Sequence, residues 1–576
     1  MDNRENISII IELLKLNNIH NIVISPGGTN IPFVSEVQED SFFTCYSVVD
    51  ERSAIYFAIG LYLQTGEVIA TSCTSAQATR NYIPGLTEAF YKRVPILAIT
   101  MCKHPRFTYQ EYMQAPDQAS LPCDCVKQSY TLPFISIKED KLHSVRLVAE
   151  AIQATVTGGK GPVQLCVPWL DFDSDNNDVK IKNVNVVDYE KFCSTNISLA
   201  AKTIMIAIGE HTKFDVETTS AIDRFCENHN AVIYANHLSN FSNKYTVKAN
   251  VILNAMEAEC FELYKPDILI TIGGQTGDYP FYNMFSKGRF DTVEHWRVSE
   301  DGKVIDTYDK LTHVFKCTEK AFFNLLKGRE GVEHSYYDLW KKLMDEVKVD
   351  IDLPFSNASI AQFLCDKIPS SSIIQFSILN SLRIWNFFPL HPSIECYSNV
   401  AAFGIDGGMS TLIGQSIVSN ELAFMIIGDL AFLYDMNSIS IRHIKNNLRI
   451  IIINNNGGME FKYSKIDNEK RNEYIAAGNH YKNAEGWAET CGFEYLNAMS
   501  MDEFKECSDK LIKKSERPIV LEAFVSDIDE ADAYEALVNA NRKMTVSGNI
   551  KKEIKSSIIE VIGKENFDKI KNIVKK

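Results

Sequence analysis

The segment IIGDLAFLYDMNSISIRHIKNNLRIIIINNNGG, residues 426–458, decides the fold class of this chain. It reads as an apolar strand, a Gly-Asp corner, an amphipathic helix, a second apolar strand and an Asn-rich turn. This order places Asp429 and Asn455 at the carboxyl ends of two parallel strands, where doubly wound sheets bind ligands. Their side-chain oxygens and the Gly457 carbonyl suit Mg²⁺ held jointly with a diphosphate at a helix N-terminus. Two strand ends with ordinary turn residues would give the same dipeptides, so the first half of the chain has to decide.

Length and composition indicate a large globular protein. The chain has 576 residues, too many for one hydrophobic core, and its 45% hydrophobic and 23% charged content is ordinary for a globular protein. A net charge of −15 argues against a nucleic-acid partner. No apolar run reaches the roughly 18 residues of a membrane span, and the N-terminus predicts an amphipathic helix rather than a signal peptide. The 14 cysteines form no CxxC pair, which indicates a reducing compartment, so we expect a cytoplasmic protein.

Helices and strands alternate along three stretches, which predicts an α/β protein with three doubly wound parallel-sheet domains. A polar linker near residue 175 separates the first two domains. Gly273-Gly274 follows a strand in the second but lacks the GxGxxG pattern, so that domain reads as structural. The expected domains are 1–175, 176–350 and 351–548, followed by a Lys-rich helical tail at 549–576.

Asp50 and Glu51 follow a predicted strand and open a helix, where acids are favourable even without a further role. Beyond these acids, several motifs occur in a fixed order: VISPGGTN, VVDERSAIYFAIGLYLQTG, TSCTSAQATRNYIPGLTEAFYKRVPILAIT, FSILNSLR, AAFGIDGGMSTLIG and the Gly-Asp…Asn-Asn segment. Together they resemble the MenD family of thiamine-diphosphate (ThDP) enzymes, synthases that join decarboxylated 2-oxoglutarate to isochorismate. The resemblance covers roughly residues 1–170 and 360–530 and is weaker between them.

The resemblance implies ThDP and Mg²⁺ as cofactors, with a pyrimidine-binding first domain, a central domain and a diphosphate-binding third domain. Glu51 would activate the cofactor, while Asp429, Asn455 and the Gly457 carbonyl would hold the metal. Gly404 would accept from the aminopyrimidine and Ile405 would bend the cofactor, although both could be ordinary strand–turn packing. The other implied cofactor contacts are Asn380, Ser381, Gly428, Leu430, Ala431, Asn455 and Phe461.

Two further residues are candidates for contact with the reacting groups. Gln114 would face the substrate, or else be a surface amide. Glu460 stands where the family has an apolar residue; near the thiazolium, burial would favour its protonated form and suit it to proton transfer. The alternative places its side chain in solvent at a helix start.

Departures from the family concern residues that would bind substrate. Thr29 and Val400 replace family arginines, and Trp385 takes the place of another, with Arg383 two residues early. Each such arginine contributes about 1.5–3 kcal/mol to holding a carboxylate. Phe403 and Trp385 suggest a more apolar pocket, whereas a basic loop could receive an anion or simply be solvated. The candidate substrate residues are Thr29, Lys103, His104, Arg106, Arg383, Trp385 and Phe403.

These patterns predict a ThDP- and Mg²⁺-dependent 2-oxoacid decarboxylase or carboligase that acts on a substrate other than isochorismate, with a small-molecule donor and an unidentified acceptor. One alternative is a synthase of the MenD type that recognises carboxylates through Arg383, Lys103 and Arg106. Another is a non-catalytic protein with the ThDP fold. The resemblance also implies a homodimer or homotetramer, in which Glu51 serves cofactor held by a neighbouring subunit.

Overall fold

The computed structural model describes residues 4–169, 183–194, 197, 199–286, 289–326, 328, 331–461 and 471–542. These residues form three sheets, and every strand pairing in them is parallel. This confirms the predicted α/β fold class. The predicted linker after residue 175 and the tail at 549–576 lie outside the described residues, and the domain boundaries stay predictions. No helix in the described part of the chain has the length and apolarity to cross a bilayer.

The first sheet has six strands in the order β2-β1-β3-β4-β6-β5. Its central strands β3 and β4 are buried along their whole length, as in sheets that helices cover on both faces. The strands are β1 (Asn21–Ile24), β2 (Thr44–Ser47), β3 (Ile69–Cys73), β4 (Ile96–Lys103), β5 (Ser129–Thr131) and β6 (Val163–Trp169). The helices are α1 (Arg4–Leu16), α2 (Ile31–Val37), α3 (Glu51–Thr65), α4 (Ala78–Asn81), α5 (Ile83–Lys92) and α6 (Lys138–Ala154).

The second sheet has seven strands in the order β10-β9-β8-β11-β12-β13-β7. Its strands are β7 (Asn185–Asp188), β8 (Ile204–Ile208), β9 (Ala231–Ala235), β10 (Thr246–Val247), β11 (Ile268–Ile272), β12 (Glu294–Val298) and β13 (Leu311–Lys316). The helices are α7 (Tyr189–Ser194), α8 (Val216–Asn228), α9 (Asn250–Ala255), α10 (Tyr279–Phe285), α11 (Glu319–Leu325) and α12 (Ser335–Asp345).

The third sheet has six strands in the order β15-β14-β16-β17-β19-β18, which is the order of the first sheet repeated. In both, the order reverses beside the first strand, and the crevice at such a reversal is where open α/β sheets bind ligands. The strands are β14 (Ile373–Phe376), β15 (Glu395–Ser398), β16 (Ala423–Gly428), β17 (Leu448–Asn454), β18 (Glu494–Ala498) and β19 (Ile519–Phe524). The helices are α13 (Asn357–Leu364), α14 (Asn380–Trp385), α15 (Gly408–Val418), α16 (Asp429–Asp435), α17 (Glu485–Thr490), α18 (Met501–Leu511) and α19 (Asp527–Ala540).

The helix expected between β16 and β17 is shorter than its sequence pattern predicts. α16 ends at Asp435 and is followed by a 3-10 turn, Met436–Ser440. Within that turn the Ser438 and Ser440 hydroxyls donate to the carbonyls of Asp435 and Asn437, at 2.7 and 2.8 Å. Side chains that bond to nearby backbone compete with regular helix, which explains the early end.

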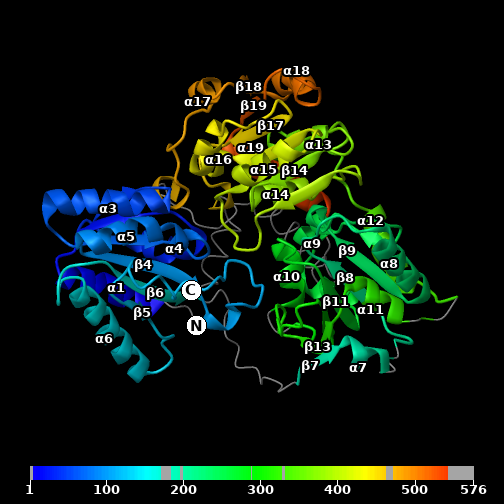
Figure 1. Ribbon diagram of the computed structural model, residues 1–576, viewed down its shortest axis with the longest axis horizontal. Helices are drawn as coiled ribbons and strands as arrows, with labels where there is room; N and C mark the ends of the chain where they lie inside the picture. The colour runs from blue at the N-terminus through cyan, green and yellow to red at the C-terminus, as the bar shows by residue number, and fades with distance from the viewer. Residues whose placement is uncertain are drawn as a thin grey trace, which may run out of the picture.

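The three units surround a common centre, with the third above and between the other two (Figure 1). The first and third units also touch directly. Tyr474 donates to the Cys45 carbonyl at 3.3 Å, Ser47 Oγ lies 2.8 Å from His480 Nε2, and Ile475 packs into the core of the first unit. The carboxyl ends of their two sheets therefore face one another across a shared space within one chain.

Candidate active site

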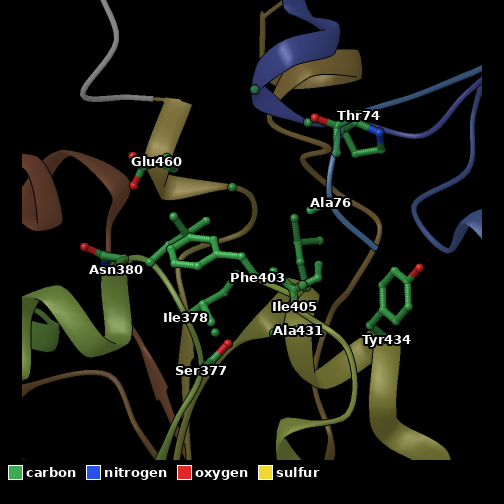
Figure 2. A pocket seen from close by; sticks show the side chains of 18 of the residues that line it. Thr74, Ala76, Ser377, Ile378, Asn380, Phe403, Ile405, Ala431, Tyr434 and Glu460 are labelled. Atoms are coloured by element: carbon green, nitrogen blue, oxygen red, sulfur yellow. The ribbon is translucent and has the colours of Figure 1, made fainter. Parts of the chain in front are cut away.

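A cavity of about 390 Å³ lies between the first and third units. Its walls are the loops that follow the carboxyl ends of β1 and β3 on one side and of β14, β16 and β17 on the other, and most of the lining is apolar. In Figure 2, Ile405 stands between the first-unit loop that carries Thr74 and the third-unit turn that carries Glu460. The volume and the apolar lining with few polar groups are typical of a small-molecule site.

Glu51 forms the acidic end of this cavity. It begins α3 behind its N-cap Asp50 and is 6% exposed. The Tyr434 hydroxyl donates to its carboxyl oxygen, and Asn81 Nδ2 donates to that hydroxyl at 2.8 Å. Burial, reinforced by the negative charges of Asp50 and Asp406, raises the pKa of Glu51 to about 8. Glu51 is therefore protonated at neutral pH and has a proton to donate.

This raised pKa makes the stability contribution of Glu51 depend on pH. The folded protein holds the proton up to about pH 8, whereas the unfolded chain releases it near the ordinary value of 4.5. Between these values the folded state binds more protons, so its stability falls as pH rises. We expect the thermal midpoint of the wild type, relative to Glu51→Gln, to drop steadily from pH 5 to 8. A difference that stays constant, like that of the exposed control Glu88→Gln, would contradict the assigned pKa.

Asp429 begins α16 at the opposite wall of the cavity and is 2% exposed. Its two carboxyl oxygens accept from the Leu430 and Gly457 amides, at 2.7 and 2.9 Å. Burial raises the pKa of Asp429 to about 7. Gly457 has φ +150°, and a Cβ there would lie 2.9 Å from the Ala476 carbonyl, so the turn requires glycine. Asn455, 9% exposed, lines the cavity beside them.

These three residues fit a hard divalent cation. The buried Asp429 carboxylate receives its two hydrogen bonds from backbone amides, so a cation beside it would compensate the buried charge. Carboxylate, amide and carbonyl oxygens are the donors that Mg²⁺ accepts. In the described part of the chain no cluster of three His, Cys, Asp or Glu side chains offers a metal site.

The middle of the cavity is shaped by two backbone turns. Leu379, before α14, and Phe403, before Gly404, have positive φ of 64° and 63°, a conformation that is uncommon for bulky residues and clusters at functional sites. A Cβ at Gly404 would meet Asp406 Oδ1 at 2.1 Å and Gln77 at 3.0 Å, so the chain passes closely there. The predicted cofactor residues all line this cavity: Asn380, Ser381, Gly404, Ile405, Gly428, Leu430, Ala431, Asn455 and Phe461. Glu51, the group of Asp429, Asn455 and Gly457 (the candidate metal corner) and the turns between them fit ThDP.

The predicted substrate residues divide into two groups. Thr29, Lys103, Gln114 and Phe403 line the cavity, and their contact with substrate stays a prediction. Trp385 does not line the cavity, because its side chain is fully buried. Its indole nitrogen donates to Asn357 Oδ1 at 3.0 Å and so joins α14 to α13.

The basic loop after β4 also differs from its prediction. Arg106 points to the second unit, where its guanidinium pairs with Asp309 at 2.9 Å. The His104 ring accepts from the Arg106 amide at 3.1 Å, and neither residue is part of the cavity lining. Of this loop, Lys103 alone reaches the cavity, because it is the last residue of the buried strand β4.

Glu460 and Arg383 contact one another, although the sequence predicts separate roles for them. Arg383 Nη1 and Nη2 donate to Glu460 Oε2 and Oε1 at 2.8 and 3.0 Å. Two parallel charge-assisted hydrogen bonds of this kind make a bidentate ion pair. Glu460 is therefore engaged with Arg383, whereas the sequence predicts a proton-transfer role for it.

Sequence patterns do not reveal Tyr434, Asn81, Ser377 and Asp406, all of which line the cavity. For Tyr434 a signal exists, because it lies three residues after Ala431 and so shares its face of α16. Nothing in the sequence marks Asn81 as a partner of Tyr434, since the two residues are 353 positions apart.

Comparison with known proteins agrees with this geometry. Residues 7–121 match the family model described as thiamine pyrophosphate enzyme, N-terminal TPP binding domain. The 2-succinyl-5-enolpyruvyl-6-hydroxy-3-cyclohexene-1-carboxylate synthase of Phocaeicola vulgatus is 30% identical over 556 residues, which is 93% of this chain and 99% of the relative. The synthases of the same name from Bacteroides fragilis and Flavobacterium psychrophilum are 30% and 29% identical, covering 93% and 89% of this chain and 99% and 95% of theirs.

These full-length matches overturn the prediction that the substrate differs from that of the family. That prediction rested on arginines missing from particular positions of the family's motifs. A carboxylate can be bound by any cation near the cavity, wherever that cation lies in the sequence. Lys103 and Arg383 are two such cations. The non-catalytic alternative falls as well, because the chain is a ThDP-dependent enzyme. With a match to the N-terminal TPP binding domain and a relative 30% identical along nearly its whole length, the chain belongs to the 2-succinyl-5-enolpyruvyl-6-hydroxy-3-cyclohexene-1-carboxylate synthase family of thiamine-diphosphate enzymes.

Proposed function

We propose that this protein is itself a 2-succinyl-5-enolpyruvyl-6-hydroxy-3-cyclohexene-1-carboxylate synthase that uses ThDP and Mg²⁺. It would release CO₂ from 2-oxoglutarate and join the remaining four-carbon unit to isochorismate. The observation that carries the proposal is the 30% identity over 99% of a relative with this name. The cavity supports it, because Glu51 and the Asp429 corner lie on opposite walls of one space.

The residues of the chain divide the work between the two walls. When bound, ThDP supplies the electron sink that accepts the electrons released with CO₂. Protonated Glu51 would donate a hydrogen bond to the cofactor, and Asp429, Asn455 and the Gly457 carbonyl would hold the metal. Ile405 would contact the cofactor between these two ends of the cavity. The apolar lining would keep water, a competing proton source, away from the reacting groups.

The assay that tests this function uses purified protein with ThDP, Mg²⁺, 2-oxoglutarate and isochorismate. We expect CO₂ release from 2-oxoglutarate, and a product whose mass equals the sum of the two substrates less CO₂. Omitting ThDP, or chelating the metal, should abolish both signals. If CO₂ is released but isochorismate is never consumed, the protein is a decarboxylase and the proposed synthase activity is refuted.

A further inference from the structure

The ion pair between Arg383 and Glu460 joins two elements at the edge of the cavity. Arg383 belongs to α14, and Glu460 to the short turn Met459–Phe461 that follows the metal corner. The two terminal guanidinium nitrogens each donate to one of the two carboxylate oxygens, at 2.8 and 3.0 Å. The Arg383 side chain is 15% exposed and that of Glu460 is 34% exposed. This fork-on-fork geometry is the one in which arginine binds substrate carboxylates.

The guanidinium sits at the border between the main cavity and a smaller pocket of about 20 Å³. Leu379 and Phe403 line both spaces, so the border is thin. Asp278 lies on the far side of this border and is buried. Its burial raises the pKa of Asp278 to about 6, and the positive charge of Arg383 opposes that rise. Asp278 is already held by Tyr234 and Asn250. Glu460 is therefore the more exposed of the two acids near Arg383 and the one that a ligand can replace.

The charges that line the cavity favour the replacement of Glu460 by a substrate carboxylate on Arg383. Among the described residues of its lining, Glu51, Asp406, Asp429 and Glu460 are acidic, and Lys103 is the one basic side chain. Glu51 is protonated at neutral pH and a metal would compensate Asp429, so a substrate with several carboxylates would find Lys103 as the one cationic side chain among the described lining residues. Arg383 is a further cation at the border of this space, but its fork is filled by Glu460.

Resting on the proposed function, we propose that Glu460 is an internal stand-in for a substrate carboxylate, and that the substrate binds by taking its place on Arg383. The exchange replaces one bidentate carboxylate with another, so the arginine is never left buried and unpaired. A substrate without the matching carboxylate cannot make the exchange. The pair thus selects dicarboxylic over monocarboxylic substrates.

Kinetics of two single variants test the exchange. Arg383→Gln removes the fork, and we expect KM for 2-oxoglutarate to rise about 10- to 100-fold, the usual effect of losing a charge-assisted pair. Glu460→Gln removes the competitor, and we expect KM for 2-oxoglutarate to fall several-fold with kcat unchanged. KM for 2-oxopentanoate, which lacks the second carboxylate, should change little in Arg383→Gln. The matched control is Glu217→Gln, which breaks the exposed Glu217–Lys320 pair.

The pattern of results identifies which carboxylate is exchanged. KM for 2-oxoglutarate, measured by CO₂ release without acceptor, reports on the carboxylate of the donor. KM for isochorismate reports on a carboxylate of the acceptor. A change in one of these KM values alone supports the exchange. Calorimetry with glutarate needs no turnover, so it tests Arg383 even if the synthase assay fails: glutarate should bind Glu460→Gln more tightly than wild type. A loss of kcat with both donors in Glu460→Gln, or equal losses with both donors in Arg383→Gln, would overturn the proposal.

Discussion

Glu51→Gln is expected to lower the rate of CO₂ release from 2-oxoglutarate by about 10²- to 10⁴-fold, the range over which a positioned acid or base contributes. The glutamine amide keeps the shape of the side chain but cannot give up a proton as the neutral carboxyl can. In the wild type that proton is present at neutral pH, because burial raises the pKa of Glu51 to about 8. The measurement is kcat under saturating cofactor.

ThDP binding by calorimetry separates this effect from misfolding. Because the proposed diphosphate site around Asp429 lies on the other wall, Glu51→Gln should bind ThDP and Mg²⁺ within a few-fold of wild type. Glu88→Gln, in the exposed Glu88–Lys92 pair on the same unit, controls for a general effect of lost charge. A Glu51→Gln protein with wild-type kcat would refute the role given to this residue.

Asp429→Asn is expected to weaken the binding of ThDP with Mg²⁺ by about 10- to 100-fold, since a metal–carboxylate contact is lost and one charge-assisted interaction is worth about 1.5–3 kcal/mol. The protein without cofactor should be at least as stable as wild type at pH 8, because the buried carboxylate, whose pKa is raised to about 7, is removed. The variant should therefore lose the thermal stabilisation that cofactor gives the wild type.

Thermal shift with and without ThDP and Mg²⁺ measures both effects in one experiment. Asp366→Asn, at an exposed acid paired with Lys367, serves as the matched control. If Asp429→Asn keeps the full cofactor-dependent shift, the metal corner does not lie at this residue. If its stability without cofactor drops sharply, the carboxylate supports the fold through its Leu430 and Gly457 amides instead.

The three parallel sheets are predictable from sequence because each central strand is an apolar run bounded by turn residues. The same reasoning places Asp429 and Asn455 at the carboxyl ends of neighbouring strands, since both directly follow such runs, and their roles toward cofactor and metal stay predictions. Side-chain direction is harder to predict. Arg383 and Trp385 lie two positions apart on one short helix, yet the indole is buried while the guanidinium reaches the edge of the cavity. The ion pair with Asp309 directs the Arg106 side chain away from the cavity, and the spacing of residues in the sequence does not predict this pair.

Substrate identity is where reasoning by position fails most clearly. Thr29 lines the cavity as expected, but its hydroxyl contacts Thr74 Oγ1 at 2.9 Å and accepts from the Ser75 amide at 2.9 Å. It therefore shapes the loop whether or not it also meets substrate. Arg383 is a candidate for carboxylate binding from the sequence, but its pairing with Glu460 is not predictable, because these residues are 77 positions apart. A missing arginine in a motif is thus weak evidence against a substrate.

The two walls of the cavity come from units with the same strand order, and in this structure from one chain, whereas the family resemblance implies walls from two subunits. Complementation distinguishes these arrangements. Glu51→Gln and Asp429→Asn each damage a different wall, so subunits of the two variants, once mixed and allowed to exchange, can form an intact site only if the walls meet across chains. Recovered activity would show that the enzyme works as an obligate assembly of reciprocal halves. Persistent inactivity would show that each chain is catalytically autonomous, and that any oligomer it forms serves another purpose.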